Sequence, residues 1–204
     1  MRKAYLVQLN KKFERESNWL LNQCMLCLAN ISRHDNNEKQ FRLSGEMTVI
    51  RLHDSWARFC RELVVMSAGS KPFSINNVRI PLAPGINTPL DVIPKLFSTF
   101  PKTRKYEPKW ASATECIDAA QRLRISNFAS VSSAIGSTTS PINEIRCVRN
   151  FFAHRGKSTA DDIRSLSSYS SLSFVSFELL VGDIVYPGIP RVASWVLNLQ
   201  LIAT

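Results

Sequence analysis

The distribution of proline constrains the fold of this chain more than any other feature of its sequence. Seven of its ten prolines lie between residues 70 and 110, and a proline inside an α-helix breaks or kinks it. That stretch therefore excludes a long helix, although Thr88-Pro89-Leu90 could begin a short one that reaches Phe97. So long a connection between packed helices usually has a function of its own, as a lid or a partner-binding surface.

Hydrophobic periodicity predicts two long helices ahead of the proline-rich stretch. Apolar residues recur at helical intervals from Leu6 to Leu28, in a segment free of glycine and proline. A second apolar stripe runs from about Glu46 to Ser67, and Gly69 is a suitable C-terminal stop. The polar residues 32–40 between the two stripes mark a turn.

Further helices are predicted after the proline-rich stretch. They run from Pro108 through Arg124, from the N-cap and first-turn pair Ser140-Pro141 to His154, from Asp161-Asp162 over a short distance, and from Val192 to Ile202. The segment 126–140 is rich in serine and small residues. Because no repeat or boundary is visible, the sequence predicts one all-α domain over residues 1–204, with a proline-rich insert at about 70–110.

Composition and charge favour a folded protein that attracts polyanions. Hydrophobic residues make up 45% of the 204 residues, which is enough to bury a sizeable core and excludes a disordered chain. The formal net charge is +10 and the pI is near 9.7, so the surface attracts nucleic acids and other polyanions. Many basic proteins bind no nucleic acid, so the charge alone does not decide the function.

The cysteines and the lack of long apolar runs bear on the compartment. Five cysteines, an odd number scattered through apolar stretches, do not suggest a disulfide framework. Cys24 and Cys27 have metal-ligand spacing, but no second pair follows and both lie on an apolar helical face, so we interpret them as small hydrophobic residues. No segment resembles a signal peptide or a membrane span. We expect a soluble, cytoplasmic protein without a metal or cofactor.

The most informative segment is Arg149-Asn150-Phe151-Phe152-Ala153-His154, near the end of a predicted helix. Asn150 and His154 are four residues apart, so they lie one turn apart on the same helical face. Arg149 lies on an adjacent face, from which its long side chain can reach the same point. The helix thus presents a guanidinium, an amide and an imidazole together, and all three can act on a phosphate.

These groups suit cleavage of RNA without a metal, in which the 2′-hydroxyl attacks the adjacent phosphorus and the 5′-oxygen leaves. Histidine titrates near neutral pH, so His154 can serve as general base or acid. Arg149 can bind the phosphate and stabilise its growing charge, while Asn150 orients the histidine or a phosphate oxygen. One histidine cannot easily perform both proton transfers, so either solvent helps or a second copy of the chain contributes its own.

Basic residues around the motif are candidate contacts to the RNA backbone. Arg146, Arg155 and Lys157 are expected to hold phosphates rather than to read bases. An alternative path would follow three other basic residues, Lys102, Arg104 and Lys105. A structural explanation also fits the motif, because cations near a helix C-terminus complement the helix dipole.

The pattern Arg149-Asn150-x-x-x-His154 resembles the signature of the HEPN superfamily, in which arginine and a polar residue precede a short spacer and histidine. The resemblance covers six residues, and the predicted helices agree with the HEPN fold over most of the chain except the proline-rich insert. It implies a HEPN-like helical bundle and a metal-independent endoribonuclease of toxin–antitoxin or anti-phage systems. It also implies a homodimer in which two motifs meet in one cleft, which would supply the second histidine.

One position departs from the HEPN pattern. In HEPN toxins paired with a nucleotidyltransferase antitoxin, a tyrosine two residues past the histidine is modified, whereas this chain has Gly156 there. Any silencing would therefore use another antitoxin or regulatory protein. A catalytically silent HEPN-like module that binds RNA or a protein is the alternative function, and a purely structural dimerisation bundle is a third. The intact motif favours the enzyme.

The other histidines and the dimer contact are less constrained. His53 lies on an apolar helical stripe beside Trp56, so we interpret it as a core or interface residue. His34, in a polar turn, is expected to be solvated. The dimer contact could come from the helix around Trp56 or from the apolar residues of the last helix, Val192, Trp195, Val196, Leu199 and Ile202.

Overall fold

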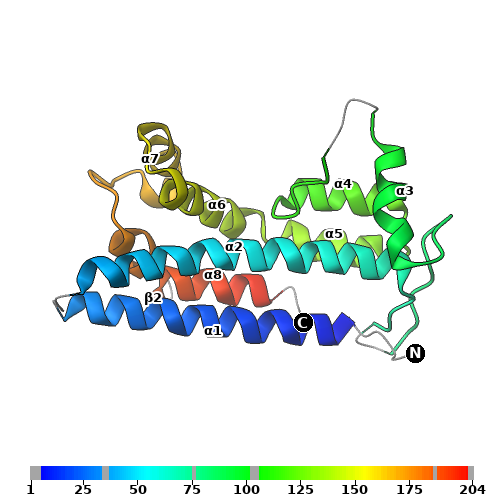
Figure 1. Ribbon diagram of the computed structural model, residues 1–204, viewed down its shortest axis with the longest axis horizontal. Helices are drawn as coiled ribbons and strands as arrows, with labels where there is room; N and C mark the ends of the chain where they lie inside the picture. The colour runs from blue at the N-terminus through cyan, green and yellow to red at the C-terminus, as the bar shows by residue number, and fades with distance from the viewer. Residues whose placement is uncertain (1–5, 34–36, 75–76, 102–105, 186–187, 202–204) are drawn as a thin grey trace. The chain divides into compact units, whose positions relative to one another are not determined.

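The computed structural model describes residues 6–33, 37–74, 77–101, 106–185 and 188–201. Helices dominate these ranges (Figure 1), so the prediction of an all-α chain is confirmed. Within them, the strands form one short antiparallel pair, β1 (Ile184–Val185) with β2 (Ile189–Pro190). None of the helices in these ranges combines the length and apolar character needed to cross a bilayer.

Two long helices, α1 (Leu6–Ser32) and α2 (Glu38–Gly69), form the N-terminal third. Both were predicted, but α2 begins at Glu38 rather than at about Glu46. The additional turns depend on charge pairing, because Arg42 lies 2.5 Å from the carboxylates of both Glu38 and Glu178. Hydrophobic periodicity could not reveal these turns, since ion pairs rather than an apolar stripe hold them.

A close approach at the end of α2 begins the proline-rich stretch. A Cβ at Gly69 would lie 2.7 Å from the Cα of Pro89 and 2.9 Å from the carbonyl oxygen of Thr88, so a larger residue would displace the backbone. Thr88 precedes the 3-10 helix η1 (Pro89–Asp91), and α3 (Val92–Thr99) follows it. The short helix expected here is therefore present and extends slightly beyond its predicted end.

The rest of the chain carries shorter helices. They are α4 (Ala113–Leu123), α5 (Phe128–Gly136), α6 (Thr139–His154), α7 (Lys157–Arg164), η2 (Ser167–Tyr169), η3 (Glu178–Gly182) and α8 (Arg191–Gln200). The serine-rich segment, for which no element was predicted, forms α5 because Val131 and Ile135 bury an apolar face. Because most residues of this segment are small or polar, hydrophobic periodicity did not predict the helix.

Capping explains why α4 is shorter than predicted. It begins after Ser112 rather than at Pro108, because the Ser112 hydroxyl accepts a hydrogen bond from the backbone amide of Glu115 at 3.4 Å. It ends at Leu123, one residue before the predicted end, and Arg124 is its C-cap, with a left-handed backbone and φ of 53°. Pro108, the predicted start, therefore lies before the helix and not in its first turn.

Helix α6, which carries the predicted motif, and helix α7, which follows it, also begin at residues other than those predicted. Helix α6 starts at Thr139, one residue before the expected N-cap Ser140. Helix α7 starts directly after Gly156, whose backbone amide donates to the hydroxyl of Thr159 at 3.1 Å. The expected start at Asp161 is wrong, because this local cap begins the helix a turn earlier and leaves Asp161 in its second turn.

The chain divides into two compact units. Residues 1–14, 56–139 and 200–204 make up the first, and residues 15–55 and 140–199 make up the second. Each unit contains part of α1 and part of α2, because the boundaries fall inside these helices. The single domain expected over residues 1–204 stays a prediction.

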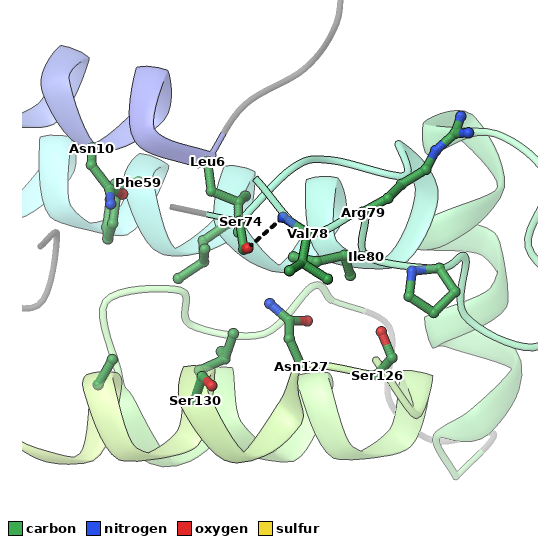
Figure 2. Close-up of a pocket in the computed structure, with 14 residues that line it drawn as sticks. Leu6, Asn10, Phe59, Ser74, Val78, Arg79, Ile80, Ser126, Asn127 and Ser130 are labelled. Carbon is green, nitrogen blue, oxygen red and sulfur yellow. Dashed lines mark hydrogen bonds between the residues drawn. The ribbon is translucent and has the colours of Figure 1, made fainter. Parts of the chain in front are cut away.

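The core of the first unit is centred on aromatic side chains. The ring of Phe13 lies 5.8 Å from that of Trp56 and 4.9 Å from that of Phe59, and all three are buried. Phe59 also lines a cavity of about 590 Å³, toward which Asn127 projects from the N-cap position of α5 (Figure 2). The Oδ1 atom of Asn127 is buried without a hydrogen-bond partner among the described residues.

All five cysteines are buried, which agrees with the interpretation of Cys24 and Cys27 as small apolar residues. Burial, with a contribution from Cys27, raises the pKa of the Cys24 thiol to about 12. This thiol is therefore protonated at neutral pH. In the part of the chain that the structure describes, no group of three or more His, Cys, Asp or Glu side chains is placed to hold a metal ion.

Candidate functional site

Helix α6 carries all three residues of the predicted motif and belongs to the second unit from residue 140 onward. Its buried stripe includes Ile145 and Phe152, and Arg149 falls on this stripe, four residues after the first and three before the second. Arg149 is accordingly half-buried, and its Nε has no hydrogen-bond partner among the described residues. The helix thus holds a guanidinium at the edge of the core.

The amide and the imidazole of the motif lie on the same helix. Asn150 is half-buried, and its Oδ1 accepts a hydrogen bond from Nη1 of Arg149 at 3.3 Å. His154 is the last residue of α6 and is exposed, one turn beyond Asn150 as the spacing predicted. Arg146, one turn before Asn150, is exposed and donates to the side chain of Asn143 at 2.7 Å.

Arg155, directly after the motif, closes α6 and fixes its end to α2. Its backbone is left-handed, with φ of 44°, and its amide donates to the carbonyl of Phe151 at 2.7 Å. Its guanidinium forms an ion pair with Glu46 of α2, a residue that is only 8% exposed. Because a buried carboxylate needs a compensating cation, this pair holds the end of α6 against α2. Arg155 therefore has a structural partner that the sequence did not indicate.

Lys157, the third expected contact to the RNA backbone, is the first residue of α7 and is exposed. Together with Arg146 it presents positive charge on either side of the motif. The alternative RNA path along Lys102, Arg104 and Lys105 lies outside the described residues, as does His34.

A second histidine, His53, belongs to α2. Seven residues separate it from Glu46, so both lie on the same side of α2, and its side chain is 15% exposed. Burial lowers the pKa of His53, while the carboxylate of Asp54, 3.5 Å from Nδ1, opposes this shift. The charges of Arg149 and Arg146 lower the pKa further. The mostly buried imidazole agrees with the interpretation of His53 as a core or interface residue.

The sequence offered one signal for this part of the site. Glu46 and His53 are polar residues on an otherwise apolar stripe of α2, and buried polar groups usually have partners. The identity of the partners depends on how α2 packs against α6, which no motif encodes.

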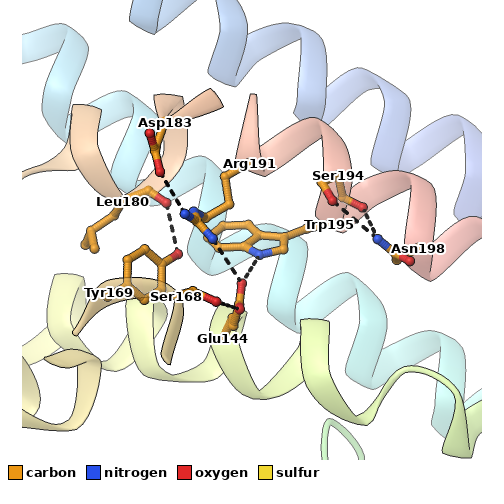
Figure 3. Close-up of polar contacts among 9 residues, drawn as sticks. All are labelled: Glu144, Ser168, Tyr169, Leu180, Asp183, Arg191, Ser194, Trp195 and Asn198. Carbon is orange, nitrogen blue, oxygen red and sulfur yellow. Dashed lines mark hydrogen bonds and ion pairs between the residues drawn. The ribbon is translucent and has the colours of Figure 1, made fainter. Parts of the chain in front are cut away.

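A partly buried polar cluster holds the first half of α6 (Figure 3). Glu144 accepts hydrogen bonds from Nε1 of Trp195 at 2.9 Å and from the hydroxyl of Ser168 at 2.5 Å. Nη1 of Arg191 lies 3.9 Å from the same carboxylate, and its Nη2 donates to Asp183 at 2.8 Å. These contacts tie α6 to α8 and so fix the direction of the helix that carries the motif.

The ring of Tyr169 completes this cluster. The guanidinium of Arg191 lies over this ring, 4.5 Å from its centroid. The Tyr169 hydroxyl donates a hydrogen bond to the carbonyl of Leu180 at 3.1 Å. Burial raises the pKa of the Tyr169 hydroxyl, so it stays protonated as a donor. The support of α6 is thus built from residues that lie outside the motif.

The expected dimer contact needs a correction. Four of the apolar residues proposed for the last helix are buried within a single chain, so a second copy cannot cover them: Val192, Trp195, Val196 and Leu199. Trp56 is buried too, but the helix around it, the other proposed contact, also carries exposed side chains. Ile202 lies outside the described residues. Exposed apolar side chains of the second unit include Leu43 and Met47, one turn apart on α2. These four apolar residues of α8 therefore belong to the core.

Comparison with known proteins adds no family to this geometry. No family model matches the chain, and no curated protein or solved structure matches it. The resemblance to HEPN proteins therefore depends on Arg149, Asn150 and His154 and stays a prediction.

Proposed function

We propose that the chain is a metal-independent endoribonuclease of the HEPN type. The observation that carries this proposal is the placement of a half-buried guanidinium and an exposed imidazole on the last turns of one helix, Arg149 and His154 of α6. A guanidinium held at the edge of the core is preorganised to bind a phosphate, and an exposed imidazole can reach a bound substrate. The net charge of +10 supports a polyanionic substrate.

In the proposed reaction, the 2′-oxygen of a nucleotide forms a bond to its adjacent phosphorus as the bond from phosphorus to the 5′-oxygen breaks. A general base takes the proton of the 2′-hydroxyl, and a general acid protonates the departing 5′-oxygen. The products are a 2′,3′-cyclic phosphate and a 5′-hydroxyl. Arg149 stabilises the charge that grows on the phosphoryl oxygens, and Asn150 orients its guanidinium. His154 performs one of the two proton transfers.

Exposed cations beside the motif would bind the RNA backbone. Arg146 and Lys157 are suited to this role because both are exposed and neither pairs with a carboxylate in the described structure. The charge of Arg155 is compensated by Glu46, so its contribution to RNA binding should be smaller. Contacts of this kind hold the substrate without selecting a base sequence.

We also infer that the active unit is a homodimer whose two motif helices face one cleft. The support is the HEPN resemblance together with charge, because pairing two copies doubles the positive charge around a phosphate. The same resemblance supports a role as a toxin or anti-phage effector, held in check by an antitoxin or another regulatory protein. Light scattering should give the mass of a dimer, and a monomer with full activity would contradict this assembly.

Cleavage of single-stranded RNA in the presence of EDTA tests the proposed activity. The wild-type protein should cleave, and His154→Ala should be slower by about 100-fold or more because a proton-transfer group is lost. Its unfolding temperature should not change, since the side chain is exposed. His34→Ala removes a histidine outside the motif and should cleave like the wild type.

Two results would contradict the proposed activity. The first is cleavage that requires added Mg²⁺, and the second is wild-type cleavage by His154→Ala. RNA binding without cleavage by the wild-type protein would instead favour a catalytically silent HEPN-like module.

A further inference from the structure

We propose that the first unit binds a neutral small molecule, with an apolar body and one hydroxyl or amide group, in the cavity beside Phe59 (Figure 2). All the residues that line this cavity belong to the first unit. The proposed ribonuclease motif lies in the second unit. The inference therefore does not depend on that function.

The size of the cavity suits a small molecule. Its volume of about 590 Å³ falls within the range of about 300–1,000 Å³ that is usual for pockets that bind drug-sized ligands. Protein interiors are otherwise close-packed, with few voids larger than a water molecule. A space of this size beside a packed aromatic core therefore has room for a ligand.

Two helices give the cavity apolar walls. Helix α2 contributes Phe59 and Leu63, which lie one turn apart, and α5 contributes Val131 and Ala134. Water in such surroundings has few hydrogen-bond partners. Transfer of apolar ligand surface from solvent into this space is favourable, so the body of the ligand should be apolar.

Asn127 supplies a polar group at one end of the α5 wall. It precedes Val131 by four residues, so the two lie on the same face. Its Nδ2 donates to the hydroxyl of Ser67 at 3.2 Å, whereas its buried Oδ1 has no partner among the described residues. Figure 2 shows the amide projecting from the start of α5 toward the segment that carries Val78 and Ile80. A buried acceptor without a donor is destabilising, and a hydroxyl or amide of a ligand could supply the donor.

The charges around the cavity favour a neutral ligand. Among the lining residues that the structure describes, Arg79 alone carries a charge. It is exposed, and Figure 2 shows its guanidinium directed away from Asn127. An ionised group placed beside Asn127 would lose its hydration without gaining an opposite charge. The polar group of the ligand should therefore be uncharged.

The proline-rich stretch forms a third, preorganised wall. The backbone amide of Ser74 donates to the carbonyl of Val78 at 2.9 Å, and the amide of Val78 donates to the Ser74 hydroxyl at 3.2 Å. The amide of Leu6 joins this wall to α1 through the carbonyl of Phe73 at 3.1 Å. Val78 is 62% exposed and thus presents an apolar side chain at the solvent side of the cavity. A wall that is already ordered lowers the entropic cost of binding.

Calorimetric titration of the full chain with 1-octanol tests the site, because this probe joins an apolar chain to one hydroxyl. We expect saturable binding of one molecule per chain. Octanoate has the same chain length but a charged head, so it should bind at least about 10-fold more weakly. Absence of saturable 1-octanol binding would overturn the proposal. Octanoate binding that equals or exceeds that of 1-octanol would overturn the neutral class of ligand.

Two serines of α5 provide a matched pair of variants. Ser130 and Ser133 are both exposed, but only Ser130 is among the residues that line the cavity. Ser130→Phe should fill part of the cavity and abolish 1-octanol binding, whereas Ser133→Phe should bind like the wild type. Undiminished binding by Ser130→Phe, or an equal loss in both variants, would place the bound octanol elsewhere and overturn the proposal.

Asn127→Ala tests the polar end of the site. Loss of one hydrogen bond should weaken 1-octanol binding by about 10-fold. Toluene has no hydrogen-bonding group, so its binding should be the same in the variant and the wild type, which also shows that the cavity is intact. An equal loss for both probes, or 1-octanol binding at the wild-type level, would contradict the role of Asn127.

Discussion

At the scale of single residues, the end of α6 shows that a motif depends on side chains outside it. Arg155 has a left-handed backbone, which costs a residue other than glycine about 1–2 kcal/mol. Its ion pair offsets this cost, because Glu46 would otherwise be a buried carboxylate without a compensating cation. Arg155 thereby determines where α6 ends and where the imidazole of His154 lies.

Two substitutions at Arg155 separate its side chain from its backbone. Arg155→Ala loses the pair and keeps the backbone cost, so we expect the free energy of unfolding to fall by about 1–3 kcal/mol. Arg155→Gly loses the pair but also relieves the backbone, so it should be about 1 kcal/mol more stable than the alanine variant. Urea unfolding measures both. An alanine variant as stable as the wild type would contradict the structural role of the pair.

The residues of the site differ in how far the sequence could predict them. Arg149, Asn150 and His154 were predictable because helix geometry fixes their relation within two turns. Glu46 was not, since its role follows from which face of α2 meets α6. The burial of Trp195 in α8 was not predictable either, because an apolar helix face has the same pattern in a core and at an interface.

At the scale of elements, periodicity predicted that helices exist, and local contacts decided where they begin. Ion pairs extend α2 back to Glu38, the Ser112 hydroxyl delays α4, and the Gly156 turn advances α7. Helix α6 is held at both ends, by the cluster around Glu144 and by the pair at Arg155. The motif therefore lies between two anchors on a helix with a fixed direction.

Substitution of Glu144 tests the first anchor. Glu144→Ala leaves Nε1 of Trp195 without its acceptor and removes a carboxylate near Arg191, so the free energy of unfolding should fall by about 2–3 kcal/mol. Glu144→Gln keeps an oxygen that Trp195 can bind and should lose less. Urea unfolding of the two variants gives both values. Equal losses would mean that the hydrogen bond contributes nothing beyond the charge.

At the scale of the whole molecule, the chain forms two compact units, each with its own core. Proline placement and periodicity were enough to predict an all-α fold with a short-helix insert. The division into units was not predictable, because it depends on contacts between segments far apart in the sequence. The proposed site lies within the second unit, and the cavity beside Phe59 lies within the first.

The salt dependence of RNA binding tests how the net charge of +10 is used. Replacing Arg146 and Lys157 by glutamine should reduce the slope of log K against log salt by about 1.4 for a single strand, or about 0.7 per phosphate contact. Adding Arg155→Gln should change the slope little more, because Glu46 already compensates that charge. An unchanged slope for the double variant would place the RNA path elsewhere.

The central claim is that the 2′-hydroxyl of RNA is the nucleophile, and the chemical ends of the products test it most directly. RNA cleaved by the wild-type protein in EDTA should carry 2′,3′-cyclic phosphate and 5′-hydroxyl ends. A matched strand with a single 2′-deoxynucleotide at the cleavage position should stay intact there. Products with 5′-phosphate and 3′-hydroxyl ends, or cleavage at the deoxy position, would contradict the mechanism built on Arg149 and His154.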